Sequence, residues 1–592
     1  MHEINRYLGI INDMIKRFVH ILCLITVCMT FAINAYAAVH LYSPLKYQVT
    51  GIDDDVVKKN VILTLLNLRS GLHVPIKPEE IHRFMKKAPG DIKNAVTPYG
   101  YFKSHVQSSL IKTSRGWLAT FAVTLGPALP ITAIDIDIQG EGKNNPAFQH
   151  FLNHLPFQRN HALQTEQYET AKINLYDIAT QLGYFDAKMI KSQIRINLKK
   201  YYAHIIIIFN TGKRYRFGPT IFSKTPFDEK FLHRFLQYKQ GQYYDAKKIE
   251  ATQEGFVAGN YFNQVIIKPE PRQAIDGYIP IHVALIPRKA RAYTLGLGYG
   301  TDTGVRGTLG FSIRRIGNKG HRFHTLLRAS QHDSSLTAKY IIPGFNPATD
   351  QFSIAAGASN MKQSTGNAHN AKFGIGYTMT KGHWRNSLLL AYLTERYNIV
   401  NLPFTSTQLV YPTLETKYTN TDSKTKPRKG IVIETELTGA DKNVLSQTNF
   451  FQAVAHINTL YTISKTHTRL LFRSDIGHTS INNLIRLPLS LQLFAGGSRS
   501  VRGYGYNSIG PGRNLVVAST EVQQKIKGAF YLAAFVDAGV VGNQNIFHHI
   551  NVGTGPGIVW VTPIGAMELT IADAFTQSND PWSVQFTMGT PI

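Results

Sequence analysis

Residues 293–300 read YTLGLGYG, a strict alternation of large apolar side chains with small ones. This alternation is typical of a β-strand whose two faces meet different surroundings. The large side chains of one face are Tyr293, Leu295, Leu297 and Tyr299. The other face carries a threonine and three glycines, so the segment predicts a strand with one apolar face.

The same alternation recurs down to the C-terminus. The last segment of this kind places on one face Trp582, Val584, Phe586 and Met588. Similar segments, broken by Gly, Asn, Asp and Pro, fill residues 290–592. An apolar outer face over about ten residues per strand is the pattern of a barrel closed in a membrane. We therefore predict an all-β transmembrane barrel of about 16 antiparallel strands. A pair of soluble β-sandwiches is the alternative.

A glycine-rich segment, GGSRSVRGYGY at positions 496–506, interrupts the strands of this half. Its Arg502 is a planar five-donor fork, well shaped to hold one or two carboxylates. Glu521 and Asp537 lie on the polar face of the two predicted strands that follow this segment. A loop tucked into the lumen could therefore be pinned to the wall by Arg502. A solvent-facing loop arginine is the alternative.

Before the barrel, a pattern repeats about every 80 residues, which indicates an array of small modules. In each repeat a helix-like stretch ends in Tyr-Phe, at Tyr101-Phe102, Tyr184-Phe185 and Tyr261-Phe262. Two strand-like segments follow each pair. We expect three β-α-α-β-β modules over residues 38–128, 129–213 and 214–289, with the aromatic pairs as core anchors. The exposed sheet edge of such a module can accept an extended segment of another chain.

The first 37 residues have the pattern of an export signal. Lys16 and Arg17 precede an apolar run, and Ala35-Tyr36-Ala37 supplies a small-x-small cleavage site; a membrane anchor is the alternative. Both cysteines, Cys23 and Cys28, lie inside this segment. The mature chain is therefore expected to have no disulfide, thiolate metal site or cysteine nucleophile.

The chain has a net charge of +27, and the two halves of the expected mature chain, residues 38–290 and 291–592, carry +13 each. It suits proximity to anionic lipid or lipopolysaccharide headgroups, or attraction of acidic clients. No nucleic-acid recognition signature accompanies it, and export argues against a nucleic-acid partner. The sequence has no Walker A loop, no H-E-x-x-H and no G-x-S-x-G motif. We expect neither an enzyme nor a bound cofactor or metal.

Four motifs together resemble the Omp85 superfamily of outer-membrane assembly proteins, and the repeated modules resemble its POTRA domains. The motifs are Val501-Arg502-Gly503-Tyr504, the segment 535–539, Gly555-Pro556-Gly557 and the segment 295–304. The resemblance implies that Arg502 is a lock arginine, with Asp537 and Glu521 as its acidic partners. It also implies a Gram-negative outer membrane location, with the modules in the periplasm.

Three modules are typical of the TamA branch of this superfamily. That resemblance implies insertion of client outer-membrane proteins, such as autotransporters, through a seam between the first and last strands. It further implies a TamB-like partner, anchored in the inner membrane and reached through the first module. A two-partner-type secretion channel, which passes its client through the lumen, is the alternative function.

Overall fold

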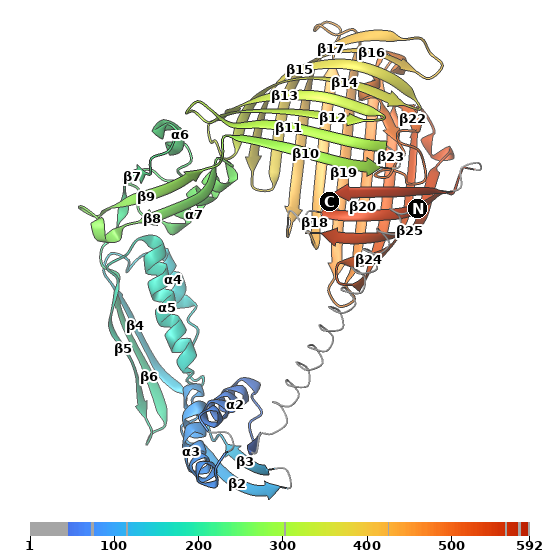
Figure 1. Ribbon diagram of the computed structural model, residues 1–592. Coiled ribbons are helices and arrows are strands. Elements are labelled where there is room, and N and C mark those ends of the chain that lie inside the picture. Colours follow the sequence, from blue (N-terminus) through green and yellow to red (C-terminus); the bar gives the residue numbers. More distant parts are fainter. Residues whose placement is uncertain are drawn as a thin grey trace, which may run out of the picture. The chain divides into compact units, whose positions relative to one another are not determined.

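The computed structural model describes residues 45–72, 76–113, 116–300, 304–423, 426–562, 565–577 and 582–589. The expected export signal, residues 1–37, lies outside these ranges. The chain forms two compact units (Figure 1). The first comprises the described residues up to Arg216 together with Tyr243–Ala246, and the second comprises the rest.

The first unit begins with a three-stranded sheet in the order β1-β3-β2, packed against two helices. Asp54 caps the first helix through its carboxylate, which accepts from the backbone N–H groups of Val56 and Val57. The second helix begins at Pro78, a residue that the first turn of a helix tolerates, with Glu79 and Glu80 in the same turn. The bounds are β1 (Leu45–Thr50), α2 (Asp55–Ser70), α3 (Pro78–Val96), β2 (His105–Thr113) and β3 (Gly116–Thr124).

A second sheet of the same plan follows, in the order β4-β6-β5. Its long helix spans Thr165–Leu182 and ends where Gly183 adopts a left-handed conformation. Tyr184 then enters the core, edge-on to Phe148. The bounds are β4 (Ile131–Gln139), α4 (Pro146–Asn153), α5 (Thr165–Leu182), β5 (Lys188–Asn197) and β6 (Tyr202–Asn210).

A third sheet, in the order β7-β9-β8, lies against the barrel within the second unit. Tyr261 is buried and its hydroxyl donates to the Gly320 carbonyl, 2.8 Å away, in a turn of the barrel. The Arg322 guanidinium covers the same ring. The bounds are β7 (Arg216–Phe222), α6 (Glu229–His233), α7 (Ala246–Ala258), β8 (Phe262–Pro269) and β9 (Tyr278–Pro287).

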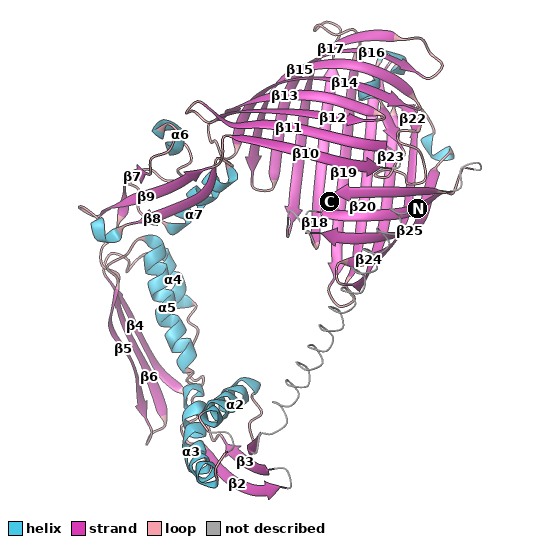
Figure 2. Ribbon diagram, viewed as in Figure 1, coloured by secondary structure: helices cyan, strands magenta, loops and turns pink. Residues whose placement is uncertain are grey.

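The described part of the C-terminal half forms a sheet of sixteen strands that pair with their neighbours in chain order, which confirms the predicted barrel (Figure 2). Adjacent strands in this order run antiparallel. The strands are β10 (Arg291–Gly300), β11 (Gly304–Ile316), β12 (His321–Ser330), β13 (Asp333–Pro343), β14 (Asp350–Gln363), β15 (Gly366–Lys381), β16 (Trp384–Ile399), β17 (Thr405–Thr421), β18 (Lys429–Ala440), β19 (Phe450–Ile463), β20 (Thr468–Ile481), β23 (Asn514–Lys527), β24 (Phe530–Gly542), β25 (Asn551–Thr562), β26 (Gly565–Ala574) and β27 (Ser583–Gly589).

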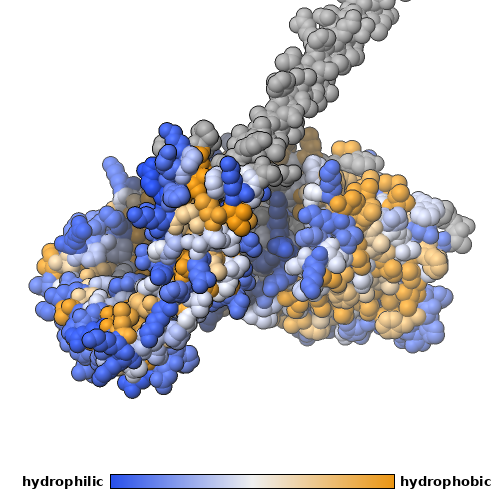
Figure 3. Space-filling view, turned by 90° about the horizontal axis from the view of Figure 1, so that it is seen from below, coloured by the Kyte–Doolittle hydropathy of each residue, from blue (hydrophilic) through white to orange (hydrophobic). Residues whose placement is uncertain are grey.

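Apolar side chains gather on the visible outer surface of the barrel (Figure 3). Exposed examples from strands around the sheet are Leu295, Leu309, Leu336, Phe373, Leu388, Phe451, Val522, Trp560 and Leu569. Polar and charged residues alternate with them and face the lumen, as in membrane barrels. Within the described ranges, every helix is too short or too polar to cross a membrane.

The Tyr261 contact generates the first prediction. Tyr261→Phe removes the hydrogen bond to the Gly320 carbonyl while it keeps the aromatic core. We expect hydrogen exchange of the 317–322 turn to accelerate about fivefold, as loss of one neutral hydrogen bond implies. Tyr238→Phe is the matched control, because that hydroxyl bonds Thr220 inside the third module. Equal exchange of the turn in both variants would contradict a docking role for Tyr261.

Candidate functional site: a loop pinned inside the barrel

A 32-residue loop, residues 482–513, joins β20 to β23 and carries the predicted glycine-rich segment. It contains two short helical turns, η3 (Leu484–Arg486) and η4 (Leu489–Leu491). Two short strands, β21 (Leu493–Ala495) and β22 (Ile509–Gly512), then pair with each other. The loop contacts strand residues that alternate with the exposed apolar ones, so it lies on the luminal side of the sheet.

The first part of the loop is anchored to β16. The Tyr397 hydroxyl donates to the Ile485 carbonyl at 2.7 Å, and the Ser490 N–H donates to Glu395 at 3.1 Å. Leu487 and Leu489 are buried against the luminal side chains of the surrounding strands. Sequence reasoning missed this anchor, because its polar contacts on the loop side use main-chain groups that carry no sequence signal.

The second part of the loop is anchored by Arg502, whose side chain is 1% exposed. Its Nε and Nη2 donate to the two carboxylate oxygens of Asp537 at 2.7 and 2.9 Å, a bidentate pair. The Arg502 backbone N–H donates to the same carboxylate at 3.0 Å. Nη1 donates to Glu521 at 2.6 Å. The structure thus brings together the three residues that the sequence singled out.

A third carboxylate, which sequence reasoning missed, completes the cluster. Glu568 of β26 accepts from Arg502 Nη1 at 2.9 Å, and its side chain is 20% exposed. Phe535 closes another side, with its ring centroid 3.4 Å from the guanidinium carbon. The cluster therefore joins the loop to β23, β24 and β26. Glu568 lies at a luminal position of its strand, which is the one signal that could have marked it.

One guanidinium among three carboxylates leaves an excess of negative charge in a buried place. A second buried arginine, Arg469 of β20, reduces the imbalance through a relay. Its Nη1 donates to Gln523 at 2.7 Å, and the Gln523 amide donates to Glu521 at 2.5 Å. This network satisfies more of the lone pairs on the buried acids than the Arg502 guanidinium alone would.

Glycines in the barrel wall make room for the loop. A Cβ atom at Gly553 would lie 1.8 Å from the Arg502 carbonyl oxygen, and one at Gly539 would lie 2.4 Å from the Val501 side chain. Gly503 itself has φ of 96°, a conformation that only glycine adopts without strain. Val501 is buried, and the buried Tyr504 hydroxyl hydrogen-bonds Thr576. The residues Val501–Tyr504 thus pack closely against the barrel wall at positions where glycine leaves room for them.

The predicted seam lies at the two ends of the sheet. Hydrogen-bonded ladders join the described barrel strands in chain order from β10 to β27, and among these residues none joins β27 back to β10. Some Cα atoms of the two strands nevertheless lie within 8 Å of each other. The described residues of the two terminal strands are therefore neighbours with no ladder between them.

The seam residues line the outer face of these two strands. Tyr293, Leu295 and Leu297 of β10 are exposed, Leu297 to 84%. The side chain of Tyr299 lies outside the described side chains. On β27, Val584 and Met588 are exposed and Phe586 is half-buried. Trp582 was expected to open the last strand, but it precedes β27, which begins at Ser583, where the ladder with β26 begins.

The ion pairs and hydrogen bonds of this arrangement hold the loop in place. Its acids surround a guanidinium, and among the described residues no group of three or more His, Cys, Asp and Glu side chains could hold a metal ion. A sixteen-stranded barrel with a luminally anchored loop and preceding α+β modules defines a class, the outer-membrane barrel with periplasmic modules.

Comparison with known protein families identifies the family to which this barrel belongs. The model of the Omp85 superfamily domain matches residues 292–591, about half of the chain. The chain belongs to the Omp85 superfamily. A model described as POTRA domain, TamA domain 1, matches residues 46–125. The chain is therefore an outer-membrane β-barrel protein whose N-terminal modules lie in the periplasm.

Individual relatives are distant. The chain is 23% identical to the outer membrane protein assembly factor BamA of Nitratidesulfovibrio vulgaris over 296 residues, 47% of this chain and 36% of that protein. It is 21% identical to BamA of Neisseria meningitidis serogroup B over 442 residues, 61% of this chain and 54% of that protein. The matches thus span less than two thirds of either relative.

Among solved structures, the fold is similar to the crystal structure of BamA from Haemophilus ducreyi lacking POTRA domains 1–3. The TM-score is 0.64 at 16% identity, over 77% of this chain and 99% of that one. This likeness concerns the fold alone.

The number of bonds on each acid generates the second prediction. We expect thermal stability to fall most in Asp537→Asn, less in Glu521→Gln and least in Glu568→Gln. Asp537 accepts three hydrogen bonds from Arg502, whereas Glu521 and Glu568 accept one each. Loss of the main buried ion pair costs about 3–5 kcal/mol.

Heat-modifiable gel mobility, which reports the folded barrel, measures this order. Glu436→Gln, a carboxylate of β18 remote from Arg502 in the sheet order, is the control. An equal loss in all three variants would contradict the assignment of Asp537 as the principal partner.

Proposed function

We propose that this protein inserts client outer-membrane proteins, such as autotransporters, through the seam between β10 and β27. The observation that supports the proposal most directly is that no hydrogen-bonded ladder joins these two strands within the part of the chain that the structure describes. In a barrel that serves only as a pore, full closure removes every strand edge. Here the first strand keeps an edge beside its neighbour, in the part of the molecule that contacts lipid.

The sequence of β10 suits a strand that accepts a partner. Gly296 and Gly298 give it little luminal packing, so side chains contribute little to holding a fixed neighbour. Its unpaired backbone groups in an apolar phase favour pairing with an incoming strand. A client strand would add to this edge by β-augmentation, and the client would then fold outward into the bilayer.

Arg502 acts in this mechanism as a lock and not as a catalyst. It fixes the loop to β23, β24 and β26, on the side of the seam that ends in β27. That wall would stay rigid while the opposite edge, at β10, accepts a strand. Val501, Gly503 and Tyr504 serve the lock by fitting the loop to the wall.

We further propose that the protein belongs to the TamA branch and works with a TamB-like partner, anchored in the inner membrane. The match of residues 46–125 to the TamA-type first module supports this assignment. Strand β2 is an edge of the first sheet, so its outer side is a place where a partner strand could add. The basic surface of the chain suits contact with anionic lipid and lipopolysaccharide headgroups.

Locking the seam tests the insertion mechanism. With Cys23 and Cys28 replaced by serine, one cysteine is placed in residues 293–297 and one in residues 584–588, and the pair that forms a disulfide is chosen. We expect outer-membrane protein assembly to stop in the oxidised protein and to recover on reduction, because a closed seam offers no edge.

The control is Leu295→Cys with Leu309→Cys, which joins two strands that are already paired in register. Full assembly by a protein with a verified seam disulfide would exclude insertion at this edge. It would favour the alternative, a secretion channel that passes its client through the lumen.

Copurification of the full chain from its native membranes tests the partner. We expect a large inner-membrane-anchored protein to copurify, and deletion of residues 46–125 to abolish its capture. Capture of a set of outer-membrane lipoproteins instead would place the chain with the BamA type of assembly factor.

A further inference from the structure

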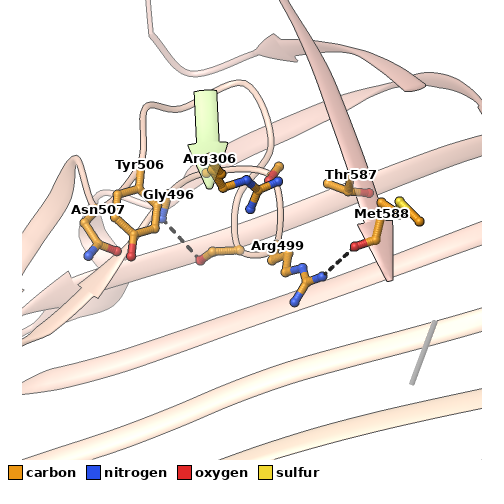
Figure 4. A pocket seen from close by; sticks show the side chains of 10 residues that line it. Arg306, Gly496, Arg499, Tyr506, Asn507, Thr587 and Met588 are labelled. Carbon is orange, nitrogen blue, oxygen red and sulfur yellow. Dashed lines mark hydrogen bonds between the residues drawn. The ribbon is translucent and has the colours of Figure 1, made fainter. Parts of the chain in front are cut away.

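The same luminal loop also contacts the last strand directly. Arg499, three residues before the lock arginine, donates from Nη2 to the backbone carbonyl of Met588 on β27 at 3.2 Å (Figure 4). Met588 lies near the end of β27, at the unpaired side of the sheet. This is a contact between the loop and a main-chain group of the seam strand itself.

A few residues further on, the loop contacts the opposite side of the seam. The Asn507 carbonyl accepts from the Thr365 hydroxyl, in the turn between β14 and β15, at 3.3 Å. In the sheet order, the short way from β27 to β14 crosses the gap between β27 and β10.

A cavity of about 260 Å³ lies between these two sets of contacts (Figure 4). The loop forms one side of it, Thr587 and Met588 of β27 form another, and Arg306 of β11 reaches toward the same space. The loop therefore runs along the luminal side of the seam with space beside it, and strands from both sides line that space.

We propose that residues 499–507 form a clasp that holds the seam from inside the lumen, with Arg499 as the positioning residue for β27. The inference rests on the proposed function only in making the seam the working part of the molecule. Because no described ladder joins β10 to β27, the clasp supplies the polar link between the two sides. Arg499 holds one side, the Asn507 carbonyl holds the other, and Arg502 fixes the loop between them.

A clasp of this kind holds the seam only while both of its ends are attached. Loss of either contact is therefore expected to free the seam, and loss of the second contact is expected to open it no further. Independent contacts would instead add their free energies, as sites that do not interact usually do. The comparison of two single variants with the double variant therefore decides between them.

The experiment measures the width of the seam without any client. Spin labels on Leu295→Cys and Val584→Cys, in a background with Cys23→Ser and Cys28→Ser, report the distance between β10 and β27 in lipid vesicles. Loss of one hydrogen bond to a charged group predicts roughly a ten- to hundredfold rise in the ratio of open to closed seams. We expect a rise in Arg499→Ala and in Thr365→Val, which removes the hydroxyl that donates to the Asn507 carbonyl, with no further rise in the double variant.

Arg486→Ala is the matched control. Arg486 is an exposed arginine of the same loop, and its side chain makes no hydrogen bond to the residues that the structure describes. Heat-modifiable mobility verifies that each barrel is folded; should Arg499→Ala not fold, Arg499→Gln takes its place. An unchanged distance distribution in both single variants would overturn the clasp, and so would multiplicative effects in the double variant.

An assembly assay on the same variants separates this inference from the proposed function. If the seam widens in these variants but a seam disulfide leaves assembly activity unchanged, the clasp is supported and insertion at the seam is excluded. A seam that does not respond, in a protein that a seam disulfide inactivates, would sustain insertion and overturn the clasp.

Discussion

The structure depends on one buried cation. Arg502 is withdrawn from water and held by carboxylates from three different strands. Burial of a charge is tolerable only where its partners are in place. Loss of the guanidinium would leave three neighbouring carboxylates without their counter-charge. The loop and this part of the wall therefore hold each other. Removing the loop from the lumen would cost far more than the loss of a few loop contacts.

The buried position of Arg502 and its loop also restricts which residues the adjacent barrel strands can carry. The loop backbone approaches β24 and β25 so closely that side chains are excluded at Gly539 and Gly553. The same strands carry Asp537 and the luminal residues around it, since Gly553 is paired with Asp537 in register. The loop residues Val501–Tyr504 and the glycines of the wall are thus sterically complementary, and each requires the other. A second anchor, at Tyr397 and Glu395, gives the loop a fixed path before it reaches Arg502.

Strand alternation was enough to predict the barrel, because a membrane imposes one face on every strand. It also placed Glu521 and Asp537 on the luminal side. The same parity holds for Glu568, yet sequence reasoning did not select it. Luminal carboxylates such as Glu415 and Glu436 follow the same pattern and face each other on β17 and β18, away from Arg502 in the sheet order. Which acids meet the loop depends on its path through the lumen, and main-chain contacts at Ile485 and Ser490 set part of that path.

The distribution of polar contacts around the seam bears on how it could open. A full ladder between β10 and β27 would bury many backbone hydrogen bonds in an apolar phase, where each lost bond costs several kcal/mol. An incoming strand would then have to replace them one by one. In the proposed mechanism, contacts made from the lumen at Met588 and Thr365 hold the two sides and leave the lipid-facing edge of β10 free of a competing strand. The barrier to opening is then set by a few polar contacts in the lumen, and the gain on accepting a client is set by the unpaired edge. Separating these two quantities lets a barrel remain closed at rest and still accept a strand without an external energy source.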